Sequence, residues 1–245
     1  MMPIVKLAGY VLFVESATFY QKKASQEFID AASNFSKRSE IEISPRKRLP
    51  TKAASCCPIY SKLLNLDLDK STIPVDLQMQ KGYILSVWGE PPWGALTEEG
   101  KHAGHFDDRL VEASKNLICE KWKPNKDIFW VACIPSLRHK NLVPDFAKRL
   151  AEELGVPFFE VLIKNSNNPP QKGMENSYHQ CKNIDGSFCV QLEDFKTFDF
   201  KKPVLLVDDI SDSGWTLTLA SALLLKHGVS KVFPFALATS NLSNV

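Results

Sequence analysis

Short apolar runs recur along the second half of the chain, separated by polar turns. Five of them have the length expected of buried strands: 127–135, 156–163, 187–192, 203–207 and 231–239. They are bounded by Gly, Pro, Asn and Asp, and several are rich in β-branched and aromatic residues. Such continuous apolar runs are typical of strands that are covered on both faces, as in a parallel sheet.

Two longer segments between these runs have the pattern of helices. The first, 142–155 (LVPDFAKRLAEELG), alternates apolar and charged positions at helical spacing and ends at Gly155. The second, 216–228 (TLTLASALLLKHG), carries Lys226 and His227 in its last turn and ends at Gly228. Strands that alternate with helices predict an α/β fold with a mostly parallel, twisted sheet and flanking helices. Ligands of such folds bind beyond the carboxyl ends of the strands.

The first half of the chain is less regular. Residues 20–60 are polar and basic, and the proline-bracketed stretch 44–52 (SPRKRLPTK) has the composition of a linker or an extended arm. Residues 75–122 are rich in aromatic residues and glycine. We therefore expect an N-terminal segment with a basic arm over 1–60, a cap or hood-like region over 61–125, and the α/β core over 126–245. A chain of 245 residues with 44% hydrophobic residues can fill one substantial core with a smaller appendage.

Composition narrows the class of protein only slightly. The net charge of +2 predicts no partner by itself, although residues 1–60 hold nine lysines and arginines against five acids. The six cysteines form no CxxC pair, so neither a zinc site nor a disulfide framework is indicated, and a reducing cytoplasm is expected. The apolar run at the N-terminus is broken by Lys6 and Glu15 and is too short to span a bilayer. We expect no membrane association.

The stretch 204–218 (VLLVDDISDSGWTLT) holds the clearest chemistry. An apolar strand runs into Asp208 and Asp209, whose side chains point in different directions because side chains alternate along a strand. Two carboxylates there can accept hydrogen bonds from a pair of hydroxyls or act through a hydrated divalent cation. The next turn offers hydroxyls, a glycine for close approach, and the N-terminus of a helix that favours an anion: Ser211, Ser213, Gly214 and Thr216. Together these groups suit a sugar phosphate.

Other interpretations of the acid pair have less support. A Walker B strand requires an upstream GxxxxGK[ST] loop, and the nearest approach, Gly94 to Gly100-Lys101, has one residue too many and His102 in place of Ser or Thr. A phosphoacceptor receiver domain does not fit, because the strand–helix alternation begins too late. A structural role, in which the acids cap a turn, remains the alternative.

The same stretch resembles the phosphoribosyl diphosphate motif of the type I phosphoribosyltransferases, over a core of about residues 127–240. The resemblance implies a type I phosphoribosyltransferase fold that binds phosphoribosyl diphosphate with Mg²⁺. It places Asp208 and Asp209 on the ribose hydroxyls, directly or through the metal, and the loop of Asp212, Ser213, Gly214, Trp215 and Thr216 around the 5′-phosphate. The diphosphate would face Ser136, Leu137, Arg138 and His139, and a loop over 164–182 would supply Lys164 and Lys172. Asp208, Asp209 and Arg138 are the candidate catalytic residues.

A closer resemblance covers residues 43–240. The motifs WGEPPWG, GKHAGHFDDRLVEA, IPSLRHKNLVPDFAKRLAEELGVPF and PPQKGMENSYHQCKNIDGSF, in this order, are similar to the phosphoribosyltransferase-like domain of some bacterial RecQ-family DNA helicases. The stretch 171–188 (QK…N…GSF) is also similar to competence-protein phosphoribosyltransferases. This resemblance implies a helicase partner and DNA contacts through Arg46, Lys47 and Arg48. Two functions therefore stay open: a transferase that releases pyrophosphate, and a non-catalytic sensing or DNA-binding accessory domain.

Three aromatic or basic features are ambiguous. His102 and His105 suggest a metal site but lack further ligands at suitable spacing, and Trp88 and Trp93 can stack on a base or pack in a core. Trp215 is bulkier than the residue that the family usually has in its phosphate loop. We also expect replacement of the basic arm to leave ligand binding unchanged, because the arm lies far from the acid pair in the sequence.

Overall fold

The computed structural model describes residues 41–122, 127–165, 176–192 and 197–240, together with the backbone of two N-terminal strands. These strands, β1 (Ile4–Leu7) and β2 (Tyr10–Phe13), form an antiparallel pair. The other predicted features of residues 1–40, and Lys172, lie outside the described residues. So does much of the predicted loop over 164–182.

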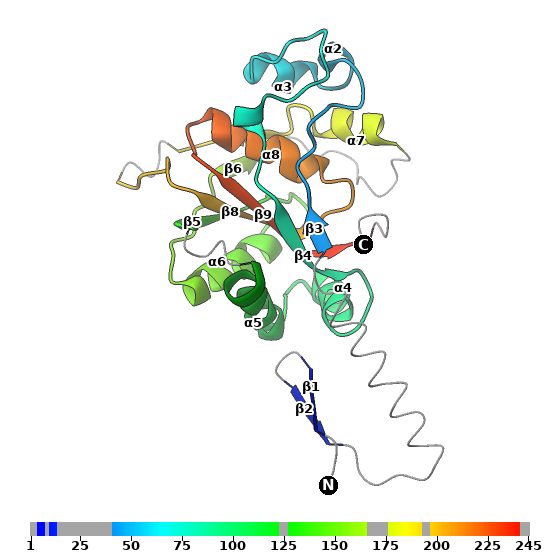
Figure 1. Cartoon of the computed structure of the whole chain (residues 1–245), viewed down its shortest axis with the longest axis vertical. Helices are drawn as coiled ribbons and strands as arrows, with labels where there is room; N and C mark the ends of the chain where they lie inside the picture. Colours follow the sequence, from blue (N-terminus) through cyan, green and yellow to red (C-terminus); the bar gives the residue numbers. More distant parts are fainter. Residues whose placement is uncertain are drawn as a thin grey trace.

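A five-stranded sheet forms the centre of the described chain (Figure 1). Its spatial order is β3-β4-β9-β8-β5, with β3 antiparallel to β4 and the other neighbours parallel. The five strands are β3 (Ile41–Ile43), β4 (Gly82–Val87), β5 (Trp130–Cys133), β8 (Val204–Ile210) and β9 (Val232–Thr239). A separate antiparallel pair is made by β6 (Leu162–Lys164) and β7 (Phe188–Val190).

Helices cover both faces of this sheet (Figure 1). One face is covered by α8 (Trp215–Lys226), with α7 (Ser177–Ile184) and the 3₁₀ turn η1 (Val75–Leu77) beside it. The short helices α2 (Ala53–Cys56) and α3 (Pro58–Leu63) lie on the same side, farther from the sheet (Figure 1). The other face is covered by α4 (Trp93–Ala103), α5 (Asp108–Asn116), which continues into the π-helical turn η2 (Leu117–Trp122), and α6 (Leu142–Leu154).

Side-chain alternation along the strands divides the apolar residues into two cores. On β8, Val204 and Leu206 pack toward α8, while Leu205 and Val207 pack toward α6. Almost all residues of α8 from Trp215 to Leu224 are buried, and most of them are apolar, so this helix has almost no polar face. The strand β9 is buried along its whole length. This arrangement confirms the predicted α/β fold with a mostly parallel sheet and flanking helices.

Two parts of the chain differ from the expectation. The run 156–163 forms no continuous strand: Val131 of β5 makes a parallel bridge to Phe158 and backbone hydrogen bonds to Pro157 and Phe159, and β6 begins only at Leu162. The ring centroid of Phe159 lies 6.2 Å from that of Trp130. The second difference is that β3 and β4 complete the central sheet, so the sheet crosses both predicted boundaries, at 60 and at 125. The three-part division itself stays a prediction.

Among the helices of the described residues, none combines the length and apolar character needed to cross a membrane.

Candidate ligand-binding site

The acid pair lies at the carboxyl end of β8, which continues through both aspartates to Ile210. Asp208 is 7% exposed and its Oδ1 accepts a hydrogen bond of 2.9 Å from the backbone N–H of Asp209. Burial, and then the charge of Asp209, raise the pKa of Asp208 well above its usual range. Asp209 faces the opposite side of the strand and meets Lys101 of α4, with 2.8 Å between Oδ2 and Nζ. The two carboxylates therefore have different environments, as their alternation predicts.

The loop after β8 leads directly into α8. Gly214 has a φ of +74°, and a Cβ at this position would meet no protein atom within 4 Å, so the protein leaves open space beside it. No side chain caps the first turn of α8 at Gly214, which leaves backbone N–H groups for an anion. Asp212 fastens the loop to the end of β9, because its Oδ1 accepts hydrogen bonds from the backbone N–H and the hydroxyl of Ser240.

A second loop follows β5 and lies next to the first. The backbone N–H of Ile134 donates to the carbonyl of Val207 at 2.8 Å, which fixes the start of this loop beside β8. The hydroxyl of Ser136 accepts a hydrogen bond of 3.3 Å from the backbone N–H of His139. Arg138 and His139 are exposed and border the cavity described next.

One cavity of about 600 Å³ joins these elements. It contains most of the predicted site residues: Ser136, Leu137, Arg138, His139, Lys164, Asp208, Asp209, Asp212, Gly214 and Thr216. The ammonium group of Lys164 lies 5.7 Å from the ring centroid of Phe188, and burial lowers the pKa of Lys164. These predicted residues include three carboxylates, of Asp208, Asp209 and Asp212, and two cationic side chains, of Arg138 and Lys164, which come from separate elements.

Ser213 and Trp215 do not line the cavity. Both are buried, and their side-chain Oγ and Nε1 atoms have no hydrogen-bond partner among the described residues. Trp215 is 2% exposed and packs into the core under α8. The bulky indole therefore does not narrow the space in which a ligand would lie.

The basic arm is part of this region, contrary to the expectation. Arg46 donates from Nε to the backbone carbonyl of Ser213 at 2.9 Å, and its guanidinium lies 5.7 Å from the ring centroid of Trp215. The premise of that expectation is wrong, because a separation of 167 residues in sequence becomes a direct contact in the fold; the effect of the arm on ligand binding stays a prediction. Lys47 and Arg48 are exposed.

Other lining residues are not among the predicted site residues, although Ser211 was expected to offer a hydroxyl and Trp88 was considered for stacking on a base. They are Trp88, Glu98, Lys101 and His102 near α4, Asn183, Ile184, Ser187 and Phe188 near β7, and Ile210, Ser211 and Ser240. A signal for Lys101 exists in the topology. Lys101 lies on α4, the helix that follows β4, and the carboxyl ends of parallel strands share one edge of the sheet. Lys101 could therefore be placed near the acid pair from the sequence, but only if β4 were first recognised as a strand of this sheet.

The ambiguous aromatic and basic residues take separate positions. Trp88 lines the cavity, 6.0 Å from the ammonium of Lys101, while Trp93 packs against the core near α6. His105 faces Asp145 with 3.5 Å between Nδ1 and Oδ2. No group of three or more metal-ligating side chains occurs within the described part of the chain.

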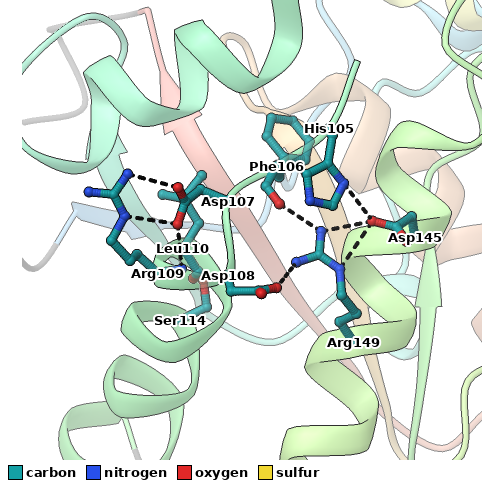
Figure 2. A network of polar contacts seen from close by, with 9 residues as sticks. All are labelled: His105, Phe106, Asp107, Asp108, Arg109, Leu110, Ser114, Asp145 and Arg149. Atoms are coloured by element: carbon teal, nitrogen blue, oxygen red, sulfur yellow. Dashed lines mark hydrogen bonds and ion pairs between the residues drawn. The ribbon is translucent and has the colours of Figure 1, made fainter. Parts of the chain in front are cut away.

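A polar network fixes the segment between α4 and α5 onto α6 (Figure 2). Arg149 donates to Asp145 from Nη2 at 2.7 Å, to Asp108 from Nη1 at 2.6 Å and to the carbonyl of Phe106 at 2.7 Å. The ring of Phe106 packs edge-on against Phe146. Because α4 ends just before this segment, the network helps to set the position of Lys101 at the cavity.

Comparison with known families identifies part of this region. Residues 145–241 match the family model described as "Phosphoribosyl transferase domain". The matched residues include the acid pair, the loop around Gly214 and the helix α8, but not β4 or β5. The predicted relationship to phosphoribosyltransferases is confirmed for this segment, while the resemblance to the helicase-linked domain stays a prediction.

Solved structures with similarity to the chain include phosphoribosyltransferases. An adenine phosphoribosyltransferase is 20% identical, with a TM-score of 0.39, and the match covers 56% of this chain and 74% of that chain. A purine phosphoribosyltransferase from Pyrococcus horikoshii is 21% identical, with a TM-score of 0.33 and coverages of 55% and 75%. An adenine phosphoribosyl transferase from Trypanosoma brucei, in complex with AMP, pyrophosphate and ribose-5-phosphate, is 14% identical, with a TM-score of 0.35 and coverages of 100% and 88%. No curated protein matches the chain.

Proposed function

We propose that the protein binds phosphoribosyl diphosphate with Mg²⁺ and transfers the phosphoribosyl group to an acceptor, with release of pyrophosphate. The observation that carries this proposal is the single cavity that joins the acid pair of β8, the loop around Gly214 and the loop after β5. A sugar that bears a phosphate at one end and a diphosphate at the other needs these three groups at once.

The phosphate end of the ligand fits the loop at the start of α8. Gly214 leaves space where a side chain would intrude, and the first amides of α8 have no side-chain cap. Thr216 lines the cavity next to these amides and offers a hydroxyl. We expect the 5′-phosphate to accept hydrogen bonds from these groups.

The ribose and diphosphate fit the remaining polar groups. The carboxylate of Asp209 can accept hydrogen bonds from ribose hydroxyls, with Asp208 beside it on β8. Arg138 and Lys164 supply positive charge where the diphosphate departs, which stabilises the leaving group. The two loops hold both ends of the sugar and so fix the anomeric carbon for attack.

The donor atoms also suit Mg²⁺. This ion prefers oxygen ligands and is usually held by one or two carboxylates together with substrate phosphates, rather than by an all-protein cage. Asp208 and Asp209 supply the carboxylates, and the ligand's own oxygens would supply further ligands. When bound, Mg²⁺ would neutralise charge on the diphosphate.

Calorimetric titration tests the binding step. We expect Mg²⁺-dependent binding of phosphoribosyl diphosphate by the wild type and its loss in the double variant Asp208→Asn, Asp209→Asn, in which the overall fold is retained. Asp69→Asn is the matched control, because the Asp69 side chain is 88% exposed and lies outside the cavity. Equal binding by the double variant and the wild type would refute the proposal.

A second assay separates a transferase from an accessory domain. Release of labelled pyrophosphate in the presence of a panel of nucleobases would show transfer. Binding of phosphoribosyl diphosphate without any release would favour the alternative of a ligand-sensing or DNA-associated domain. The observation that favours this alternative is the exposed pair Lys47 and Arg48 beside the site, which can contact nucleic acid phosphates.

A further inference from the structure

Arg46 lies on a segment that is held at both ends. Before it, Ile41 and Ile43 are buried on β3, which pairs with β4. After it, the carbonyl of Lys47 accepts a hydrogen bond of 2.9 Å from the backbone N–H of Ile73, and Leu49 is buried. The backbone around Arg46 is therefore anchored independently of the loop between β8 and α8, residues 211–214, which we call the phosphate loop. Contact between the two is made by the Arg46 side chain.

This side chain holds one carbonyl of the loop. Its Nε donates to the Ser213 oxygen at 2.9 Å, and its guanidinium lies over the buried indole of Trp215. A planar guanidinium can bond through its edge and stack through its face at the same time, whereas an ammonium cannot. The half-buried Arg46 differs in this from Lys47, its exposed neighbour.

The bond to Ser213 fixes the direction of the next amide. The carbonyl of Ser213 and the N–H of Gly214 belong to one planar trans peptide, so they point to opposite sides. Gly214 has a positive φ of 74° and, as a glycine, also permits the flipped peptide at little cost. The loop sequence alone does not choose between these two orientations. Arg46 does, because it holds the carbonyl on its own side of the loop.

The side that Arg46 occupies is the one away from the cavity. Gly214 and Thr216 line the cavity, whereas Arg46 and Ser213 do not. A Ser213 carbonyl that points to Arg46 therefore leaves the Gly214 N–H pointing toward the space where the phosphate would bind.

We propose that Arg46 is a positioning residue of the phosphate loop, which holds the Ser213–Gly214 peptide so that the Gly214 N–H faces the cavity. This inference rests on the proposed function, in which that loop binds the 5′-phosphate. It also gives Trp215 a role: the indole is the platform on which the guanidinium rests. Arg46 and Trp215 would then act together to hold the Ser213–Gly214 peptide in one orientation.

Three variants of the full chain test the inference. Arg46→Ala removes the donor and the stacked group. Arg46→Lys keeps the charge, but an ammonium cannot hydrogen-bond to Ser213 and stack on Trp215 at the same time. Lys47→Ala is the matched control from the same segment. The readouts are the affinity for ribose 5-phosphate, the affinity for inorganic pyrophosphate, and the amide resonance of Gly214 in the ligand-free protein.

We expect Arg46→Ala to weaken ribose 5-phosphate binding at least about tenfold, the size of one lost hydrogen bond to a charged group. Pyrophosphate, which uses the loop at 136–139, should bind as before. Arg46→Lys should recover less than half of the lost binding free energy, and Lys47→Ala should match the wild type. The Gly214 amide resonance should shift or split in Arg46→Ala, because the peptide then samples both orientations.

The two proposals fail in different ways. If the wild type binds neither ribose 5-phosphate nor phosphoribosyl diphosphate, the proposed function fails, and the Gly214 resonance alone still tests the role of Arg46. An unchanged Gly214 resonance in Arg46→Ala overturns the positioning role, whatever the ligand data show. An equal loss of ribose 5-phosphate and pyrophosphate affinity would also overturn it, because such a loss indicates general damage to the fold.

Discussion

Lys101 and Asp209 form an ion pair in the lining of the cavity, with 2.8 Å between the ammonium nitrogen and the carboxylate oxygen. Their side chains are only 29% and 15% exposed, so the pair is less screened by solvent than a surface salt bridge. Lys101 belongs to α4, and Asp209 belongs to β8 on the far side of β9. The ammonium therefore places a positive charge beside the acid pair.

A divalent cation at the acid pair, as proposed above, would compete with the Lys101 ammonium, and replacement of Lys101 should reveal this competition. In Lys101→Ala we expect Mn²⁺ or Mg²⁺ alone to bind more tightly by about fivefold, equivalent to about 1 kcal/mol, because a resident positive charge is removed from the acid pair. Calorimetry or Mn²⁺ electron paramagnetic resonance would measure the change. Lys101→Arg keeps the charge and should resemble the wild type. Weaker metal binding by Lys101→Ala would contradict this prediction.

The local part of the site could be predicted from the sequence. Asp208, Asp209 and the glycine loop follow one another along the chain, so a strand pattern and a turn pattern were enough to place them at one edge of the sheet. The helices α6 and α8 were predicted for the same reason, since each is a continuous local run followed by a glycine, although only α6 has an amphipathic pattern.

Arg46 and Lys101 could not be placed in this way. Their positions depend on β3 and β4, which join the sheet through pairing with distant residues: Ile84 of β4 pairs with Ala236 of β9. The segment 82–87 contains Gly82 and Ser86 and has no clean alternation, so its local pattern does not identify it as a buried strand. A glycine is needed at 82 because a Cβ there would lie 1.9 Å from the carbonyl oxygen of Pro234.

Asp208→Asn should raise stability while it removes function. Burial and Asp209 raise the pKa of Asp208 in the folded protein, so the contribution of this group to stability is full below its unfolded pKa and is lost as pH rises through the folded pKa. The amide removes this loss, and we expect a gain of about 1–2 kcal/mol in the free energy of unfolding near pH 8. Near pH 3 the gain should disappear.

Chemical denaturation at several pH values measures this effect. Asp209→Asn is the comparison, because it leaves Lys101 without its carboxylate partner and should not stabilise the protein. A variant Asp208→Asn that is less stable than the wild type at every pH would show that the aspartate is ionised and well solvated in the fold.

Gly214→Ala should lose both stability and phosphate binding. A side chain at a φ of +74° costs about 1–2 kcal/mol, and the new Cβ occupies the open side of the loop. Gly155→Ala is a matched control, because Gly155 has a φ of +70°, also faces open space, and ends α6 away from the cavity. We expect equal losses of stability in thermal melts but a loss of ribose 5-phosphate affinity in Gly214→Ala alone. Equal affinities would place the phosphate elsewhere.

Arg149→Ala should separate α6 from the segment that follows α4. The Arg149 side chain is 21% exposed and its guanidinium bonds to two carboxylates and one carbonyl, so we expect a loss of about 1–3 kcal/mol in the free energy of unfolding. Arg109→Ala removes a more exposed arginine of the same network (Figure 2) and should cost less than about 1 kcal/mol. Urea unfolding distinguishes the two. A cost of Arg149→Ala no larger than that of Arg109→Ala would mean that the network does not support the fold.

The DNA-associated alternative has a test that leaves the pocket intact. The double variant Lys47→Ala, Arg48→Ala should lower the slope of log K against log salt by about 2, since each neutralised phosphate contributes about 0.9. Fluorescence anisotropy with single- and double-stranded oligonucleotides at several salt concentrations measures it. Arg46 is left in place because it bonds to the phosphate loop. If the wild type binds no oligonucleotide at low salt, this alternative fails.

The pairing of β9 with β4 has a consequence for how the protein can be divided. The family match begins within α6 and excludes β4 and β5, yet these strands cover the outer sides of β9 and β8. A chain trimmed to the matched segment would present two uncovered rows of backbone amides and carbonyls on apolar strands, which are templates for edge-to-edge aggregation. The segment that carries the family's sequence signature is therefore smaller than the unit that can fold, and the arm and the strands before it belong to that unit.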